Sequence, residues 1–312
     1  MILLTGATGF LGSHILQVLL DRDLPVRVLV RNPENRHLPW KNLVEVYEGD
    51  ILDVEAVTRA LDGVETVIHN AALVSFQDKD KEDLMEVNVS GTANMVNLSL
   101  EAGVQAFLQV SSIAALGDDA VKPIDEHTPR KEGSSKSAYS ESKYRAELEV
   151  YRGIAEGLHA YMINPGAIMG PMENWSSGTG NIFQSIFKGM RFYPSGQSGW
   201  VGAKDVARAV GILLNQEIKS GERFVLVNTN WTFQKIFERM AFHLGVKPPS
   251  MKVPYYLALA VAFLGESFLK LLGRDSLITV QAIKSAGRIR TFDGSKIEGK
   301  GFSYDDFDEI TL

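Results

Sequence analysis

The chain of 312 residues is 45% hydrophobic, enough to bury a large core, and we expect one main domain with a smaller lobe. Its formal net charge of −6 and its pI of ≈ 5.6 speak against a general binder of nucleic acids or of anionic membranes. Because it contains no cysteine, disulfides and Cys-based metal sites are excluded.

A glycine-rich turn follows the first apolar run of the chain. Residues 1–4 are typical of a buried strand, residues 13–20 of a helix, and Gly6, Gly9 and Gly12 between them have the spacing G-x-x-G-x-x-G. Glycine allows a tight turn and close approach of a pyrophosphate, and the exposed helix N-terminus attracts phosphate. The pattern predicts a dinucleotide site rather than a turn without a ligand. Its expected contacts are Gly6, Thr8, Gly9, Phe10, Leu11 and Gly12.

The segments that follow alternate between strands and helices. Strands are expected at 26–30, 44–47, 66–69, 106–110 and 160–163, and helices at 53–61, 81–102 and 137–157. Asp53 is a candidate N-cap, and Gly63 and Gly103 are candidate helix stops. This alternation predicts an α/β Rossmann domain over 1–165, a doubly wound parallel sheet with ligands beyond the carboxyl ends of its strands.

The pattern changes after Pro165. Gly, Pro, Ser and Trp cluster between 166 and 202, and apolar helices are expected near 205–215, 233–244 and 255–272. We therefore expect a smaller, mostly helical substrate-binding lobe over 166–312, from which a strand at 224–227 could return to the sheet. The apolar stretch 253–265 is too short to span a bilayer and is expected to be a buried or lid helix rather than a membrane contact.

Tyr139 and Lys143 are spaced i and i+4 on one predicted helix, so the phenol and the ammonium share a face. A free phenol titrates near pH 10, and a cation one turn away should lower that pKa toward neutrality. Ser111 and Ser112 follow the strand 106–110, where a hydroxyl could donate to a substrate oxygen beside Tyr139. These groups point to acid–base chemistry at a carbonyl, although a surface helix with an exposed Tyr and Lys would have the same spacing.

Two further segments lie just beyond strand ends. His69-Asn70-Ala71-Ala72 follows the strand 66–69 and places small residues where a cofactor ribose would pass. Asp50 follows the strand 44–47 and offers a carboxylate to an adenine amino group.

With these motifs in this order, the chain resembles the extended short-chain dehydrogenase/reductase family, the NAD(P)-dependent epimerase/dehydratase superfamily, over nearly its whole length. It looks closest to the branches that resemble dihydroflavonol-4-reductase and 3β-hydroxysteroid dehydrogenase. The motifs that carry the resemblance are residues 5–12, Asp50-Ile51, Asn70-Ala71-Ala72, residues 88–92, Ser112 with Tyr139 and Lys143, residues 164–171, Asp205-Val206-Ala207 and residues 292–296.

The resemblance implies a role for each matching residue. Tyr139 would be the general acid in reduction or the base in oxidation, Lys143 would bind the nicotinamide ribose and tune Tyr139, and Ser112 would hold the substrate oxygen. Asn88 would support either a bound water or the helix geometry. The remaining cofactor contacts implied are Ile51, Asn70, Ala71, Ala72, Val110, Pro165, Gly166, Ala167 and Ile168.

Two departures from the family pattern bear on the chemistry. Nucleotide-sugar dehydratases of the family have Asp-Glu directly after the catalytic hydroxyl residue, whereas this chain has Ile113 and Ala114. Elimination of water is therefore not expected. Asn164 stands where the family often has arginine, which puts a local salt bridge in doubt.

The end of the second strand bears on the choice of cofactor. An acidic residue there would bind the adenosine 2′-hydroxyl, but this chain has Arg31, with Arg36 in the same loop. Arginine can bind a 2′-phosphate bidentately. The sequence therefore favours NADP over NAD.

The leading hypothesis is an NADP-dependent oxidoreductase that moves a hydride between nicotinamide and a secondary alcohol or ketone. An alternative is a nucleotide-sugar epimerase with tightly bound NAD, which would use the same catalytic residues and would need arginines of the second lobe to bind a diphosphate. A third hypothesis is a non-catalytic NADP-sensing protein. A largely apolar substrate is suggested by side chains that could line its pocket: Val74, Phe76, Trp175, Phe183, Phe192 and Trp200.

Partner and location expectations follow from the same features. We expect a small-molecule substrate, no nucleic acid, no membrane span and a cytoplasmic protein without a cleavable signal. The six histidines lack ligand spacing, so no metal is expected. The helices 81–102 and 137–156 are long enough to pair across a two-fold axis in a homodimer.

Overall fold

A computed structural model describes residues 1–34, 38–119, 121–130, 137–171, 175, 179–271 and 279–307, without the side chains of 267–271. A seven-stranded sheet with the order β10-β6-β5-β4-β1-β2-β3 forms its centre, and every neighbouring pair is parallel. The strands of this sheet are β1 (Ile2–Thr5), β2 (Val26–Val30), β3 (Glu45–Glu48), β4 (Thr66–His69), β5 (Ala106–Val110), β6 (Ala160–Pro165) and β10 (Arg223–Leu226).

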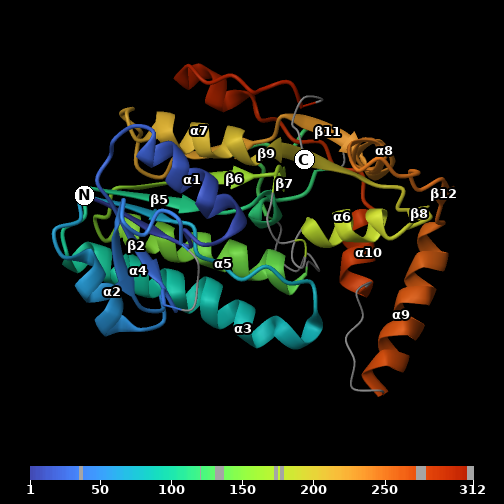
Figure 1. Cartoon of the computed structure of the whole chain (residues 1–312), viewed down its shortest axis with the longest axis horizontal. Coiled ribbons are helices and arrows are strands. Elements are labelled where there is room, and N and C mark those ends of the chain that lie inside the picture. Colours follow the sequence, from blue (N-terminus) through green and yellow to red (C-terminus); the bar gives the residue numbers. More distant parts are fainter. Residues whose placement is uncertain are drawn as a thin grey trace.

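Helices cover both faces of this sheet (Figure 1). One face is covered by α1 (Phe10–Leu20) and α7 (Ala203–Leu213), and the other by α2 (Val54–Leu61), α3 (Lys81–Met85), α4 (Gly91–Glu101) and α5 (Ala138–Ala155). Strand β1 explains the layering, because Leu4 packs into the core on the α1 side and Leu3 into the core on the other side. A strand buried on both faces is typical of a parallel sheet. The Rossmann α/β fold predicted from the sequence is confirmed.

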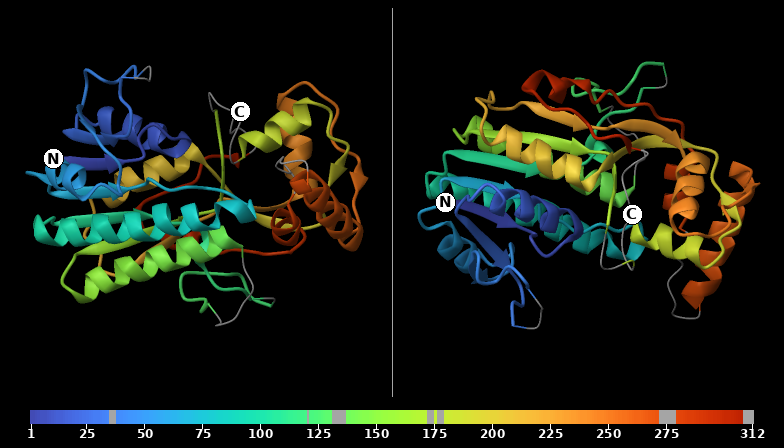
Figure 2. Two further views of the ribbon diagram at one scale, coloured as in Figure 1. Left: turned by 90° about the horizontal axis from the view of Figure 1, so that it is seen from below. Right: turned by 45° about the horizontal axis from the view of Figure 1, so that its top comes forward.

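The second lobe lies at the carboxyl end of the sheet (Figure 2). Its strands form a three-stranded sheet, in which β9 lies between β7 and β11, and a pair of β8 with β12. The strands are β7 (Ala167–Met169), β8 (Phe192–Tyr193), β9 (Gln197–Gly202), β11 (Thr229–Thr232) and β12 (Met251–Lys252), and the helices are α6 (Gly180–Phe187), α8 (Phe233–His243), α9 (Tyr255–Leu271) and α10 (Val280–Ala286).

The predicted elements agree with the structure except at four places. The helix expected at 205–215 as part of the second lobe is α7, which covers the main sheet beside α1. Asp53 caps α2 by accepting a hydrogen bond from the Ala56 N–H at 3.0 Å, and β10 returns to the main sheet beside β6, both as expected. The helix expected over 81–102 is divided by a π-helical segment at 86–90. Helix α1 begins at Phe10, inside the glycine motif, and α9 is not buried, because large apolar side chains on it are exposed. Within the described residues, no helix is both long and apolar enough to cross a membrane.

Candidate functional site

The turn between β1 and α1 needs glycine at two positions for steric reasons. Gly6 has a φ of +71°, and a Cβ on it would lie 2.8 Å from the backbone nitrogen of Ala71. A Cβ on Gly12 would lie 2.0 Å from the Gly6 carbonyl oxygen. Gly9 is the N-cap of α1 and has no side chain to occupy the first free N–H groups of the helix. The turn therefore leaves donors and space for a phosphate, which fits a dinucleotide.

A hydrogen-bond network from Thr5 fixes this turn against the segment after β4. The Thr5 hydroxyl accepts from the backbone N–H groups of Asn70 and Ala71, at 3.1 and 3.0 Å. The Asn70 side-chain amide donates to the Gly6 carbonyl at 3.2 Å. Two predicted cofactor segments, far apart in the sequence, are thus brought together at the carboxyl ends of β1 and β4.

His69 connects the same network to α4. Since the Thr5 oxygen already accepts two N–H groups, its proton goes to His69 Nδ1, 2.8 Å away. The Thr92 hydroxyl donates to the Asn88 carbonyl, so it accepts from His69 Nε2–H at 3.2 Å. Burial lowers the pKa of His69 to about 3, with nearby Lys143 acting in the same direction. His69 is therefore neutral and holds its neighbours in place; its sequence context gave no sign of this role.

The phenol, amine and hydroxyl predicted to be catalytic converge where β5 ends and α5 begins. Tyr139 lies in the first turn of α5, and its phenol is hydrogen-bonded to the Ser112 side chain. Ser112 is the N-cap of the turn 113–115, where its hydroxyl accepts from the Ala114 N–H at 3.1 Å. Lys143, one helical turn beyond Tyr139, is buried and donates from Nζ to the Val110 carbonyl at 3.0 Å.

The pKa of Tyr139 differs from the expectation. Burial raises it above the usual value, and the hydrogen bond with Ser112 opposes that effect. Burial also lowers the pKa of Lys143 to about 8, while the Glu147 carboxylate raises it. Desolvation of both groups therefore outweighs the attraction that the i, i+4 spacing suggested.

Glu147, which the sequence gave no reason to select, is the buried acid of this site. Its Oε1 accepts from the Ser111 hydroxyl at 2.5 Å and from the Asn164 side-chain amide at 2.6 Å, and its Oε2 lies 3.2 Å from Arg223. Arg223 also donates to the Glu126 carbonyl. Members of the family often have arginine at position 164, where this chain has Asn164. Arg223 of β10 supplies that positive charge instead. Because the Ser111 hydroxyl is directed to Glu147, Ser112 is the serine beside Tyr139.

The π-helical segment places Asn88 between the loop after β4 and helix α5. Its Oδ1 accepts from the Leu73 N–H at 2.7 Å, and its Nδ2 donates to the Leu73 carbonyl and to the Ser142 hydroxyl, each at 2.9 Å. Ser142 in turn donates to the Tyr139 carbonyl at 2.9 Å. These contacts support the helix geometry, one of the two roles considered for Asn88. Short π-helical segments within α-helices are frequent at functional sites.

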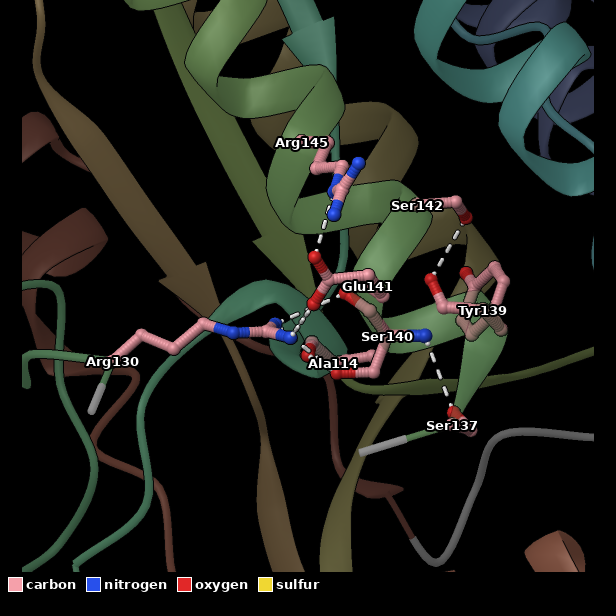
Figure 3. Close-up of polar contacts among 8 residues, drawn as sticks. All are labelled: Ala114, Arg130, Ser137, Tyr139, Ser140, Glu141, Ser142 and Arg145. Atoms are coloured by element: carbon pink, nitrogen blue, oxygen red, sulfur yellow. Dashed lines mark hydrogen bonds and ion pairs between the residues drawn. The ribbon is translucent and has the colours of Figure 1, made fainter. Parts of the chain in front are cut away.

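Ion pairs and caps fix the first turn of α5 from its outer side (Figure 3). Ser137 caps the helix by accepting from the Ser140 N–H at 3.2 Å, and the Ser140 hydroxyl donates to the Ala114 carbonyl at 2.6 Å. Glu141 binds Arg130 at 2.6 Å and Arg145 at 2.7 Å. The turn that carries Tyr139 is therefore held to the Ser112 loop independently of any ligand.

The residues expected near adenosine lie at the ends of the adjacent strands β2 and β3. Arg31 follows β2 and is 68% exposed, and its guanidinium lies 3.8 Å from the Asp50 carboxylate after β3. Asp50 also accepts from the Leu52 N–H at 3.0 Å, and Ile51 is buried. Arg36 lies outside the described residues.

The side chains expected to contact substrate divide into two groups. Val74 and Phe76 are exposed, and the Phe76 ring lies 5.8 Å from that of Tyr139, centroid to centroid. Phe183 and Trp200 are buried in the core of the second lobe, so we correct their assignment to core residues. Trp175 lies at the edge of that core, 6.0 Å from Phe183 between ring centroids, and Phe192 is exposed.

Ala167 and Ile168, beyond the end of β6, are partly exposed, whereas Pro165 and Gly166 are buried. A Cβ on Gly166 would lie 2.6 Å from the Gly199 carbonyl oxygen, so the chain packs tightly as it leaves the main sheet.

The fold and this site define the class, a dinucleotide-binding protein with a Tyr–Lys–Ser group at the carboxyl ends of the sheet strands. Residues 2–226 match the NAD dependent epimerase/dehydratase family, and the chain belongs to that family. It is an NAD(P)-dependent oxidoreductase of the extended short-chain dehydrogenase/reductase type, as the resemblance implied.

Two curated relatives match most of the chain. A putative dihydroflavonol 4-reductase of Synechocystis is 30% identical over 94% of this chain and 86% of its own length. Sterol demethylase protein B of Methylococcus capsulatus is 30% identical over 84% of this chain and 80% of its own.

Solved structures agree on the fold. The crystal structure of gox2253 has a TM-score of 0.85 and 32% identity, covering 100% of this chain and 95% of its own. UDP-glucose 4-epimerase of Thermus thermophilus, in complex with NAD, has a TM-score of 0.75 and 23% identity over 99% of this chain and 96% of its own.

Proposed function

We propose that this oxidoreductase uses NADP and interconverts a secondary alcohol and a ketone on a largely apolar small molecule. The observation that carries the proposal is the hydrogen bond between the Tyr139 phenol and Ser112, with Lys143 one turn away. When bound, the cofactor would supply or accept the hydride through its nicotinamide ring.

The chain's own groups would handle the oxygen and its proton. The Ser112 hydroxyl would donate a hydrogen bond to the substrate oxygen, on which negative charge grows as the carbonyl is reduced. Tyr139 would give that oxygen a proton in reduction and remove it in oxidation. Its raised pKa favours the protonated phenol, the form needed to protonate an alkoxide. Lys143 would bind the ribose hydroxyls of the nicotinamide half.

Arg31 supports the choice of NADP. Its exposed guanidinium lies at the carboxyl end of β2, and the 3.8 Å contact with Asp50 is a weak surface pair that a 2′-phosphate could replace. Arg31→Ala should weaken NADP binding at least tenfold and leave NAD binding little changed. Glu34→Ala, in the same loop, is the control. Tighter binding of NAD than of NADP by the native protein would contradict the choice.

The Phe76 ring beside Tyr139 supports an apolar substrate. Phe76 and Val74 are exposed on the loop after β4, and Asn88 holds the neighbouring Leu73 in place. Among the described residues no group of three or more His, Cys, Asp or Glu could hold a metal ion.

An epimerase acting on a nucleotide sugar would use the same three residues but needs cations for a diphosphate. Four arginines of the second half are already paired with carboxylates: Arg208 with Asp205 and Asp305, Arg223 with Glu147, and Arg288 and Arg290 with Asp118. This pairing favours the oxidoreductase. NAD retained through purification would favour the epimerase.

Tyr139→Phe provides the central test. Turnover of ketones, followed by NADPH absorbance across a panel of flavonoid-, steroid- and terpenoid-like carbonyls, should fall at least a thousandfold, while NADPH binding stays within about threefold. Retained turnover would refute the assignment of Tyr139. NADPH binding by the native protein without turnover of any carbonyl would favour an NADP-sensing protein instead.

A further inference from the structure

One side of α9 is fixed to the rest of the second lobe by contacts at its first residue and in its second half. The Tyr255 ring packs against Gly287, where a Cβ would lie 2.5 Å from a ring carbon. The Glu266 carboxylate accepts from the Val280 N–H at 2.8 Å, and Ala262 between them is buried. Tyr255, Ala262 and Glu266 follow helical spacing and define the inward side.

The opposite side of α9 is apolar and exposed to solvent. Its large side chains are between 56 and 83% exposed: Tyr256, Leu257, Val261, Phe263 and Leu264. At 3.6 residues per turn they cover roughly 160° of the helix circumference. No charged residue occurs from 253 to 265. Figure 1 shows α9 projecting at the outer edge of the molecule, away from the central sheet.

We call the exposed apolar side chains of Tyr256, Leu257, Val261, Phe263 and Leu264 the stripe. Its width and its lack of polar atoms decide which kind of partner fits it. An apolar patch of this kind marks an interaction surface. A helix of another protein, or of a second copy, covers a narrower seam and brings hydrogen bonds with it. The side chains of the stripe offer a single polar atom, the Tyr256 hydroxyl at the N-terminal end. Hydrocarbon needs no hydrogen-bond partner, so the stripe fits lipid.

Charge near α9 is positive although the chain as a whole is negative. The described segments 245–266 and 279–290 contain five Lys or Arg and one acidic residue, Glu266. Arg288 and Arg290 pair with Asp118. Lys247, Lys252 and Lys284 are exposed, and no carboxylate of the described chain forms an ion pair with them. These three cations are available to anionic headgroups.

We propose that α9 docks on the surface of an anionic lipid bilayer, with the stripe 256–264 in the headgroup and acyl boundary. The uncharged stretch 253–265 is too short to span hydrocarbon, so the helix lies in the plane of the interface. Tyr256 carries a ring and a hydroxyl suited to that boundary. The net charge of −6 is compatible with such docking because Lys252 lies just before α9 in the chain and Lys284 lies on α10, which packs against α9. This inference does not depend on the substrate or on NADP.

The test is flotation of the full chain with vesicles. We expect native protein to float with vesicles of equal phosphatidylglycerol and phosphatidylcholine, and at least fivefold less with phosphatidylcholine alone. The double variant Val261→Asp, Leu264→Asp should lose flotation at least tenfold. Because both side chains are exposed, the variant should keep the native melting temperature.

Leu43→Asp changes an equally exposed leucine between β2 and β3 and should float as the native protein does. Lys252→Ala should weaken flotation on the anionic vesicles only. Native protein that stays unbound to both vesicle types would overturn the proposal. So would sedimentation showing a dimer that the aspartate pair dissociates, since a second copy would then cover the stripe.

Discussion

Glu147 and Lys143 lie one turn apart on α5, and both are buried, with exposed fractions of 1% and 4%. The carboxylate raises the pKa of the amine, whereas burial lowers it to about 8. Arg223 from β10 balances the carboxylate at 3.2 Å. A cation on one side and an amine on the other therefore share one buried acid, and this acid keeps the amine protonated at neutral pH.

Replacing Glu147 should move the pH profile of turnover. In Glu147→Gln the carboxylate that raises the pKa of Lys143 is lost, so that pKa falls below about 8. Activity that needs charged Lys143 should then decline at a lower pH than in the native enzyme. Glu149→Gln, two residues further along α5, is the control. An unchanged profile with reduced stability would mean that Glu147 is only structural.

Replacing Lys143 should trade activity for stability. Burial lowers the pKa of Lys143 from 10.5 to about 8, so a protonated Lys143 destabilises the folded state relative to the unfolded state. This loss of stability is present in full below pH 8. Lys143→Met should therefore unfold with a free energy on the order of 1–3 kcal/mol higher at pH 7, while turnover is lost.

That gain should shrink as the pH rises from 8 to 10.5, because the native amine becomes neutral there in both states. Urea titrations at pH 7 and pH 10 measure it, with the exposed Lys122→Met as control. A variant less stable than native at pH 7 would show that charge on Lys143 carries no such cost.

His69 should contribute to acid sensitivity. Its pKa is about 3 when folded and 6.5 when unfolded, so between these values only the unfolded state binds the proton. Stability from this residue is complete above pH 6.5 and should fall by roughly 4–5 kcal/mol as the pH drops to 3. His69→Gln should flatten the dependence of unfolding free energy on pH in this window, measured against the exposed His243→Gln. Equal slopes for both variants would contradict the assignment.

The glycine turn allows a graded test. In Gly12→Ala the added Cβ would lie 2.0 Å from the Gly6 oxygen, so backbone must move, at a cost of about 3 kcal/mol or more, and cofactor binding should be lost. In Gly9→Ala the same oxygen is 3.3 Å away, so a smaller loss of stability is expected. Thermal melts and titration of NADPH measure both. Equal effects on stability would contradict the steric explanation.

The sequence predicted the parts of the site that depend on neighbours along the chain. The strand, glycine turn and helix at 1–20 form a local unit, and the spacing of Tyr139 and Lys143 on one helix face is fixed by helical geometry. The parallel sheet followed from the alternation of strands and helices. The assignment of Phe183 and Trp200 to the pocket was wrong, because an aromatic side chain in sequence does not reveal whether it faces a core or a cleft.

By itself the sequence determined the Rossmann fold and predicted the dinucleotide turn and the Tyr–Lys–Ser group, since hydrophobic period, glycine spacing and helical repeat are local properties. Only the tertiary structure decided that Arg223 of β10 balances Glu147 of α5, and that His69 connects Thr5 to Thr92. It also decided that α9 leaves one apolar side uncovered. Those contacts join residues far apart in the chain, and burial, which sets the pKa values of the site, exists only once they have formed.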